Sequence, residues 1–194
     1  MPTPANAPSR PSARREDLLA ATVRYVAEHN VSDLSLRPLA AAIGTSPRVL
    51  LYLFGSKEDL VREVLAAARA EQLALLERSE AEGGTPRETL ELLWHWVTAP
   101  DHRGALRLFF EGYVRAFAHA EPWRDFGATS LHEWLPPLTR ALTGTDADAD
   151  PTLVLAVLRG LLLDLLATGE EARVQAAWRH FLDTALAGHG GRTA

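Results

Sequence analysis

Apolar residues recur at three- and four-residue spacing along most of the chain, which predicts helices throughout. The first expected helix runs from about 14 to 29, followed by two short helices over 36–43 and 47–54. A long fourth helix is expected over 57–80. No segment alternates apolar and polar positions as a strand would, so the predicted fold class is all-α.

Residue types at the helix junctions support these boundaries. Ser35 and Ser56 are of a type that caps helix N-termini, and Gly44 stands where a helix end favours positive φ. Ser46 and Pro47 suit the cap and first residue of the third helix, because the fixed φ of proline matches that position. Two short helices joined by a glycine-containing turn are typical of a helix-turn-helix, although a small bundle with tight turns shares the pattern.

Beyond a glycine-rich hinge at 82–86 the chain is expected to remain helical. The further helices each carry a wide apolar face and are expected near 86–98, 103–118, 127–142, 151–168 and 170–187. The prediction is therefore about nine helices, of which three form an N-terminal helix-turn-helix module and the rest a C-terminal bundle. The expected divisions are a flexible basic arm, the helix-turn-helix domain, the bundle and a disordered tail, over 1–13, 14–61, 62–187 and 188–194.

Charge is distributed unevenly along the chain. The net charge of the 194 residues is −5, yet the first 57 carry seven basic against four acidic side chains. Three of these arginines, Arg10, Arg14 and Arg15, precede any acid. A basic front on an acidic body suits a protein that contacts phosphate with one end only.

Composition excludes several classes of protein. The chain has no Cys, so a disulfide framework, a zinc thiolate site and a cysteine nucleophile are all excluded. The N-terminal residues lack the apolar run of a signal peptide. The longest apolar stretch, 153–167, is short for a bilayer and contains Arg159 and Asp164. We therefore expect a cytoplasmic protein without a membrane partner.

The third helix and its surroundings carry the side chains that a DNA reader needs. Arg48, near the start of this helix, can contact a guanine edge with two hydrogen bonds. Arg37 lies at the start of the second helix, and Lys57 at the start of the fourth can share a phosphate with backbone N–H groups there. Tyr52 can donate its hydroxyl to a phosphate while its ring packs on the module.

The run from Leu34 to Leu60 resembles the DNA-binding signature of the tetracycline-repressor (TetR) family. The similarity extends over about residues 14–61. Matching features are a run of small residues before Gly44, the Ser46-Pro47-Arg48 opening and the ending from Phe54 to Leu60. The resemblance implies a DNA-binding regulator with a variable C-terminal domain for ligand binding and dimerisation.

The resemblance also implies roles for individual residues. Arg37 matches a DNA-contacting position of the second helix, Tyr52 matches the middle of the usual Tyr-aromatic-His group, and Lys57 matches the phosphate-binding lysine. The base-facing recognition helix is matched by Thr45, Ser46, Pro47, Arg48 and Val49. Leu51 and Leu53 depart from the pattern, because Tyr and His are common there. Those two phosphate contacts are either missing or replaced by the arginines that precede residue 16.

Aromatic residues concentrate in the C-terminal bundle. Such stripes are commonly core, yet aromatic cavities between helices also bind small molecules. The residues expected to line a ligand site are Trp94, Phe110, Tyr113, Phe117, Trp134, Leu158 and Leu162. Three polar residues in apolar surroundings, His95, Glu111 and Asp164, are further candidates. For the two carboxylates we favour internal or intersubunit pairing, Glu111 with Arg115 and Asp164 with an arginine of the next helix such as Arg173 or Arg179.

The two helices near 151–168 and 170–187 are too apolar for a monomer to cover both. They fit the place of the TetR-family dimer interface, which implies a homodimer and a palindromic double-stranded DNA operator.

No phosphate-binding loop, nucleophile elbow or histidine pair at zinc spacing occurs in the sequence, so neither an enzyme, a metal site nor a cofactor is expected. The hypothesis is a regulator, most simply a repressor, that an unidentified small-molecule effector releases from DNA. An activator remains open, as does a helical ligand- or partner-binding protein with a degenerate DNA-binding head.

Overall fold

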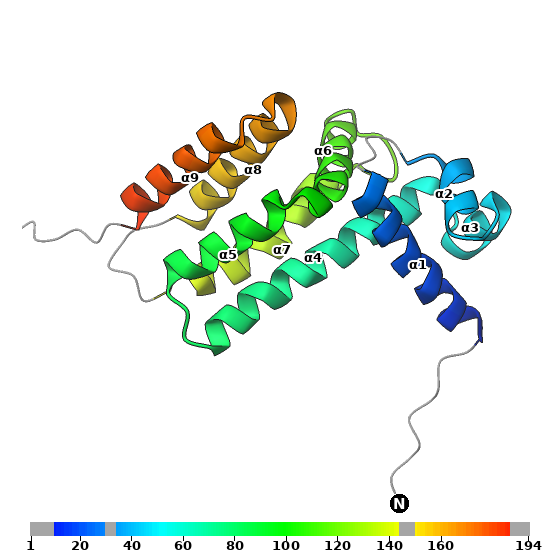
Figure 1. The fold of residues 1–194 in the computed structure, drawn as a ribbon, viewed down its shortest axis with the longest axis horizontal. Helices are drawn as coiled ribbons and strands as arrows, with labels where there is room; N and C mark the ends of the chain where they lie inside the picture. The colour runs from blue at the N-terminus through cyan, green and yellow to red at the C-terminus, as the bar shows by residue number, and fades with distance from the viewer. Residues whose placement is uncertain (1–9, 30–33, 144–149, 187–194) are drawn as a thin grey trace, which may run out of the picture.

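The computed structural model describes residues 10–29, 34–143 and 150–186, and over these residues it forms nine α-helices and one short 3-10 helix (Figure 1). The predicted all-α class is confirmed. The elements are α1 (Arg10–His29), α2 (Leu36–Ala42), α3 (Pro47–Phe54), α4 (Lys57–Ala81), α5 (Pro86–Thr98), η1 (Pro100–His102), α6 (Arg103–Phe117), α7 (Phe126–Ala141), α8 (Pro151–Thr168) and α9 (Glu171–Ala185). The expected tail and most of the expected arm lie outside the described residues.

Local side-chain chemistry accounts for the ends of the short helices. Gly44 has a φ of 68° after α2, as predicted. Ser46 Oγ accepts a hydrogen bond from the Val49 amide at 3.3 Å, and Ser56 Oγ accepts one from the Asp59 amide at 3.0 Å. Both serines therefore satisfy donors that the first helical turn leaves unpaired. Ser35 occupies the N-cap position of α2, but its side chain makes no capping bond.

Two boundaries differ from expectation. Helix α1 begins at Arg10 rather than near Arg14, because a proline in the first turn, Pro11, does not interrupt helical hydrogen bonding. The 3-10 helix η1 between α5 and α6 was not expected; the Ala99–Pro100 break contains one tight turn rather than a loop.

The described residues form two hydrophobic cores. One joins α1, α2, α3 and the start of α4, which we call the head (residues 10–65), and it includes Leu108 of α6 and Trp123. The second joins the rest of α4 to α5, α7, α8 and α9, which with α6 we call the body. Its centre is Trp178, fully buried and stacked on Trp94 with ring centroids 4.9 Å apart.

Helix α4 connects the two cores. It starts beside α2 and α3 at one end of the molecule and runs along the body beneath α5, while α8 and α9 pair at the opposite end (Figure 1). At 25 residues it is the longest helix and spans about 37 Å. A single rigid element thus reaches from the head far into the body.

Candidate DNA-binding surface and ligand cavity

The expected base-reading residues lie on the outer side of α3. Ser46 and Pro47 start the helix as N-cap and first residue, and Arg48 and Val49 follow on its exposed first turn. Within the described residues, Arg48 has no hydrogen bond or ion pair, so its guanidinium is available to an external partner. Thr45 is half-buried, and its hydroxyl oxygen has no hydrogen-bond partner within the described residues.

Three further residues are expected to contact DNA outside the base-reading turn. They are Arg37 of α2, Tyr52 near the end of α3 and Lys57 of α4. Arg37 is exposed on α2, and Lys57 is half-buried in the first turn of α4. Tyr52 is 85% exposed, so the expectation that its ring packs on the module is wrong. The ring lies on the outer side of α3, whereas Leu50 and Phe54 occupy the inner side. This exposure leaves both the hydroxyl and the ring face accessible.

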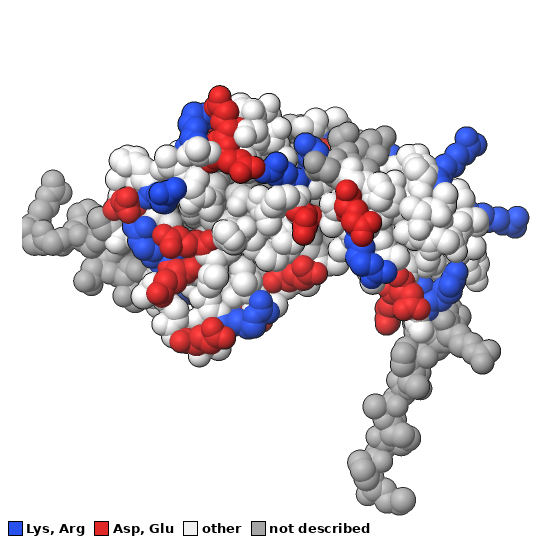
Figure 2. Space-filling model, in the orientation of Figure 1, with Lys and Arg blue, Asp and Glu red and all other residues white. Residues whose placement is uncertain are grey.

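Basic side chains project from the end of the molecule formed by α2 and α3 (Figure 2). Over the body and beside α1, acidic side chains are interspersed with basic ones (Figure 2). This arrangement agrees with the uneven charge of the sequence and gives the head a face suited to phosphate.

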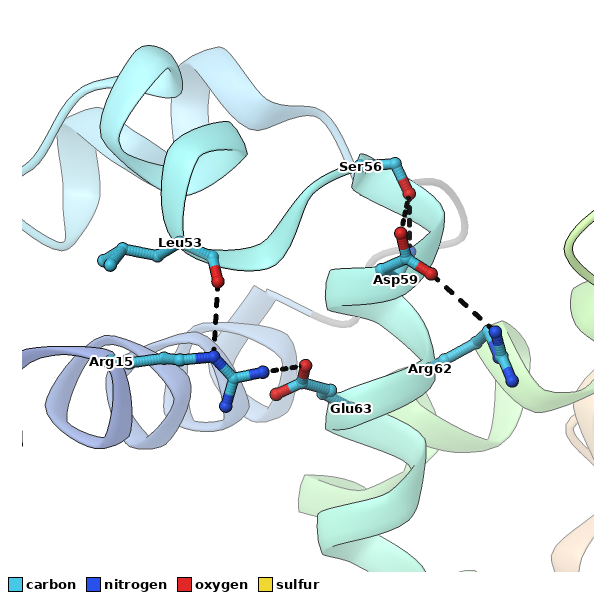
Figure 3. A network of polar contacts seen from close by, with 6 residues as sticks. All are labelled: Arg15, Leu53, Ser56, Asp59, Arg62 and Glu63. Atoms are coloured by element: carbon cyan, nitrogen blue, oxygen red, sulfur yellow. Dashed lines mark hydrogen bonds and ion pairs between the residues drawn. The ribbon is translucent and has the colours of Figure 1, made fainter. Parts of the chain in front are cut away.

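Arg15 has a structural role that the sequence did not reveal. Its guanidinium pairs with Glu63 of α4, donates from Nε to the Leu53 carbonyl oxygen at 3.3 Å, and lies 4.9 Å from the centre of the Phe54 ring (Figure 3). Arg15 thus ties α1 to the end of α3 and to α4. It is engaged inside the head, so any compensation for Leu51 and Leu53 falls to other arginines near the N-terminus.

A second set of polar contacts lies at the start of α4. Ser56 Oγ donates to Asp59 Oδ2 at 2.6 Å, and Asp59 Oδ1 lies 3.7 Å from Nη1 of Arg62 (Figure 3). Negative charge in the first turn of a helix is favourable, because the unpaired N–H groups there carry partial positive charge. These contacts stabilise the first turn of α4, where Lys57 lies.

The body contains a partly open cavity of about 80 Å³ between α4, α6, α7 and α8, which α5 and η1 also border. Four of the seven residues expected to line a ligand site border it, namely Phe110, Trp134, Leu158 and Leu162. Helix α4 contributes Leu65, Ala68, Arg69 and Gln72 to the wall. The cavity therefore borders the same helix that starts at the head.

The other three expected residues lie elsewhere. Trp94 is buried against Trp178, and its indole N–H donates to Gln175 Oε1 at 2.5 Å. Phe117 is 71% exposed at the end of α6, where no helix covers the apolar stripe. Tyr113 stands behind the wall and contacts it through Arg159.

Arg159 of α8 is the polar wall residue that sequence reasoning missed. Its Nη1 donates to Tyr113 Oη at 3.0 Å and its Nη2 to the buried Ser130 Oγ at 2.8 Å. Burial lowers the pKa of this guanidinium, and the nearby Tyr113 raises it to a lesser extent. In the sequence, Arg159 stands out only as a charged residue within the apolar stretch 153–167. That position argues against a membrane span and does not by itself indicate a binding site.

The three polar candidates from the sequence do not border this cavity. Glu111 pairs with Arg115 at 2.5 Å, and Asp164 pairs with Arg173 at 2.8 Å, so the pairings expected for both are confirmed. His95 is exposed on the outer side of α5. Among the described residues no group of three or more His, Asp or Glu side chains is placed to hold a metal ion.

Comparison with known proteins identifies the head. Residues 18–64 match the family model of bacterial regulatory proteins, tetR family. The head carries the DNA-binding domain of the TetR family. The match assigns to the head the DNA-binding fold of these bacterial regulatory proteins, and the matched residues span α1 to the first turns of α4.

Solved structures extend the similarity to the whole TetR-family fold. A transcriptional regulator from Rhodococcus sp. Rha1 is 22% identical, with a TM-score of 0.70 over 90% of this chain and 96% of that one. A Rhodococcus sp. protein assigned to the TetR family is 22% identical, with a TM-score of 0.67 over 91% and 100%. The multidrug binding protein EbrR, complexed with imidazole, is 22% identical, with a TM-score of 0.59 over 93% and 96%. At such identities the likeness establishes the fold alone. No curated protein sequence matches the chain.

Proposed function

We propose that this TetR-family regulator is a homodimeric repressor that binds a palindromic operator and is released by a small-molecule effector in the body cavity. The observation that supports this most directly is that α4 belongs to both the head and the body. Its first turn carries Lys57 beside the recognition helix, and Arg69, about 18 Å further along the axis, borders the cavity. A ligand that alters the cavity wall therefore changes the orientation of the head.

The proposed dimer uses the outer side of α8 and α9. Leu153 and Leu163 are each 53% exposed on α8, and Ala156 and Gly160 lie on the same side at heptad-like spacing. Helix α8 is long and apolar enough to cross a membrane, yet only 28% of it is buried within the chain. Pairing with a second copy would cover this side and set two recognition helices at one face of the duplex.

A dimer of this kind accounts for the apolar helix without a membrane, and a protein that binds operator DNA works in the cytoplasm. Repression rather than activation is the simpler output, because occupation of an operator by itself excludes polymerase. An effector shifts the balance only by its different affinity for the DNA-bound and released conformations.

Operator selection from random duplex DNA with the purified protein tests the proposal. The expected result at low salt is enrichment of one palindromic sequence, with half-sites whose centres lie one or more helical turns apart. Failure to enrich any palindrome contradicts it and favours a degenerate head. Transcription from a promoter that carries the selected operator then distinguishes repression from activation.

A further inference from the structure

One guanidinium in the cavity wall carries a charge that no acidic side chain balances within the described residues. Arg159 donates only to two neutral oxygens, those of Tyr113 and Ser130, and lies 5.2 and 5.6 Å from the ring centres of Tyr113 and Phe109. Rings and hydroxyls orient a cation but do not neutralise it. A charge that is partly buried without a counter-charge is destabilising, so a ligand that brings a negative charge offsets a cost already present in the fold.

The second arginine of the wall shows the contrast. Arg69 Nη1 lies 2.6 Å from Glu133 Oε2, so its charge is balanced within the body. Arg159 is consequently the source of the positive potential that a ligand in this cavity meets. The guanidinium is also held in place by two hydrogen bonds, so its planar set of donors is oriented before any ligand arrives.

Apart from the two arginines and the polar Gln72, His102 and Ser130, the wall is apolar and rich in aromatic residues. Phe110, Phe126 and Trp134 border the cavity together with Leu158 and Leu162. A volume of about 80 Å³ is that of a few water molecules by this measure, which limits the ligand to a compact body. The wall thus combines one oriented cation with flat apolar surfaces.

We infer that the effector is a compact organic carboxylate, whose charged group pairs with Arg159 and whose apolar body of about one ring lies among the aromatic side chains. A carboxylate accepts two parallel hydrogen bonds from a guanidinium, which a neutral amide of the same shape cannot do. The inference rests on the proposed function, since it gives the chemistry of the effector for the same cavity.

Three probes of matched shape test it, namely benzoate, benzamide and benzamidinium, which are anionic, neutral and cationic. Calorimetric titration of the full-length protein without DNA is expected to show benzoate binding about 10- to 100-fold more tightly than benzamide. Benzamidinium is expected to bind least, because its charge is the same as that of Arg159. Arg159→Met should remove the preference for benzoate.

The matched control is Arg124→Met, which changes the net charge equally at an exposed site paired with Glu121. This variant should retain the preference. Circular dichroism establishes that each variant is folded, and Arg159→Lys carries the test if the methionine variant is not. Lysine keeps the charge but loses the two-pronged contact, so the ratio of benzoate to benzamide affinity should fall.

Equal affinities for benzoate and benzamide, absence of benzoate binding at millimolar concentration, or an unchanged preference in the Arg159 variants each overturn the inference. Release of operator is measured separately. If benzoate binds through Arg159 but does not release DNA, the anion site is supported and its role as the effector site is contradicted. If only a neutral ligand releases the operator, the proposed function stands and the inferred preference for an anionic effector is wrong.

Discussion

Arg48 near the start of α3 and Lys57 at the start of α4 are expected to meet different parts of a duplex. Arg48 is exposed on the first turn of α3, where a side chain can reach base edges, whereas Lys57 is half-buried at the start of α4. Base edges differ between sequences and phosphates do not, so the two side chains make separable contributions to binding.

Arg48→Ala should relax base preference at the position it contacts, at a cost of about 1–3 kcal/mol, with little change in the salt dependence. Lys57→Ala should weaken selected and random duplexes alike and reduce the salt slope by about 1. Binding titrations at several salt concentrations measure both effects. A loss of preference in the lysine variant alone would show that the roles are reversed.

Residue roles were predictable from the sequence where they depend on local chemistry. The caps at Ser46 and Ser56 and the positive φ at Gly44 follow from neighbouring residues. The contacts of Arg15 and Arg159 do not, because their partners lie 38 or more and 29 or more positions away. Helical periodicity predicts which side of a helix faces inward, but not whether a core or a cavity lies there, which is why Trp94 was assigned to a ligand site.

At the scale of elements, the junction between head and body depends on how closely helices approach. A Cβ atom at Gly104 of α6 would overlap the carbonyl oxygen of Val26 in α1. The overlap is with backbone, so the helices rather than a side chain must move. Only glycine permits this contact between α1 and α6.

Gly104→Ala should therefore separate α1 from α6 and change the spacing of the two heads in the dimer. We expect weaker operator binding, together with a loss of stability of about 1–3 kcal/mol from the strained packing. Gly127→Ala is the control, since a Cβ there meets only the Tyr113 ring at 3.7 Å or more, an ordinary van der Waals contact. Denaturant unfolding and operator titration report the two quantities, and an unchanged pair of values in Gly104→Ala would contradict the role of this contact.

A polar bridge links α6 to the start of α4. Arg115 Nη1 lies 3.7 Å from Glu58 Oε1, and its Nη2 lies 2.5 Å from Glu111 Oε1. Helix α6 also contributes Phe109 and Phe110 to the cavity wall. A displacement of α6 by a ligand is therefore passed to the residue next to Lys57.

Arg115→Gln should preserve effector binding yet reduce the factor by which effector weakens operator affinity. Effector coupling in proteins is commonly 5- to 150-fold, and we expect a several-fold fall from the wild-type value. The comparison variant is Arg124→Gln, whose ion pair with Glu121 does not involve α4. Operator titrations with and without effector give the factor; equal factors in both variants would remove Arg115 from the coupling.

At the scale of the whole molecule, dimerisation decides whether two heads can bind one operator. Leu163→Glu places a charge on the exposed side of α8, so it should leave the fold of the protomer intact and abolish association. Analytical ultracentrifugation at micromolar concentration should show a monomer, and operator affinity should fall with it. Leu92→Glu, at an exposed leucine on α5, is the control and should remain a dimer.

The head core that reaches into α6 limits how regulators of this kind can be recombined. Leu108 and Trp123 belong to the same hydrophobic core as Leu60 and Val64, so the head is not a detachable unit. In a chimaera that joins the head of another regulator to this body after residue 65, those two side chains would face residues that do not pack against them. Operator specificity can therefore be exchanged in two ways. Either only the exposed residues of α3 are replaced, or the whole head is replaced together with the α6 residues that pack against it.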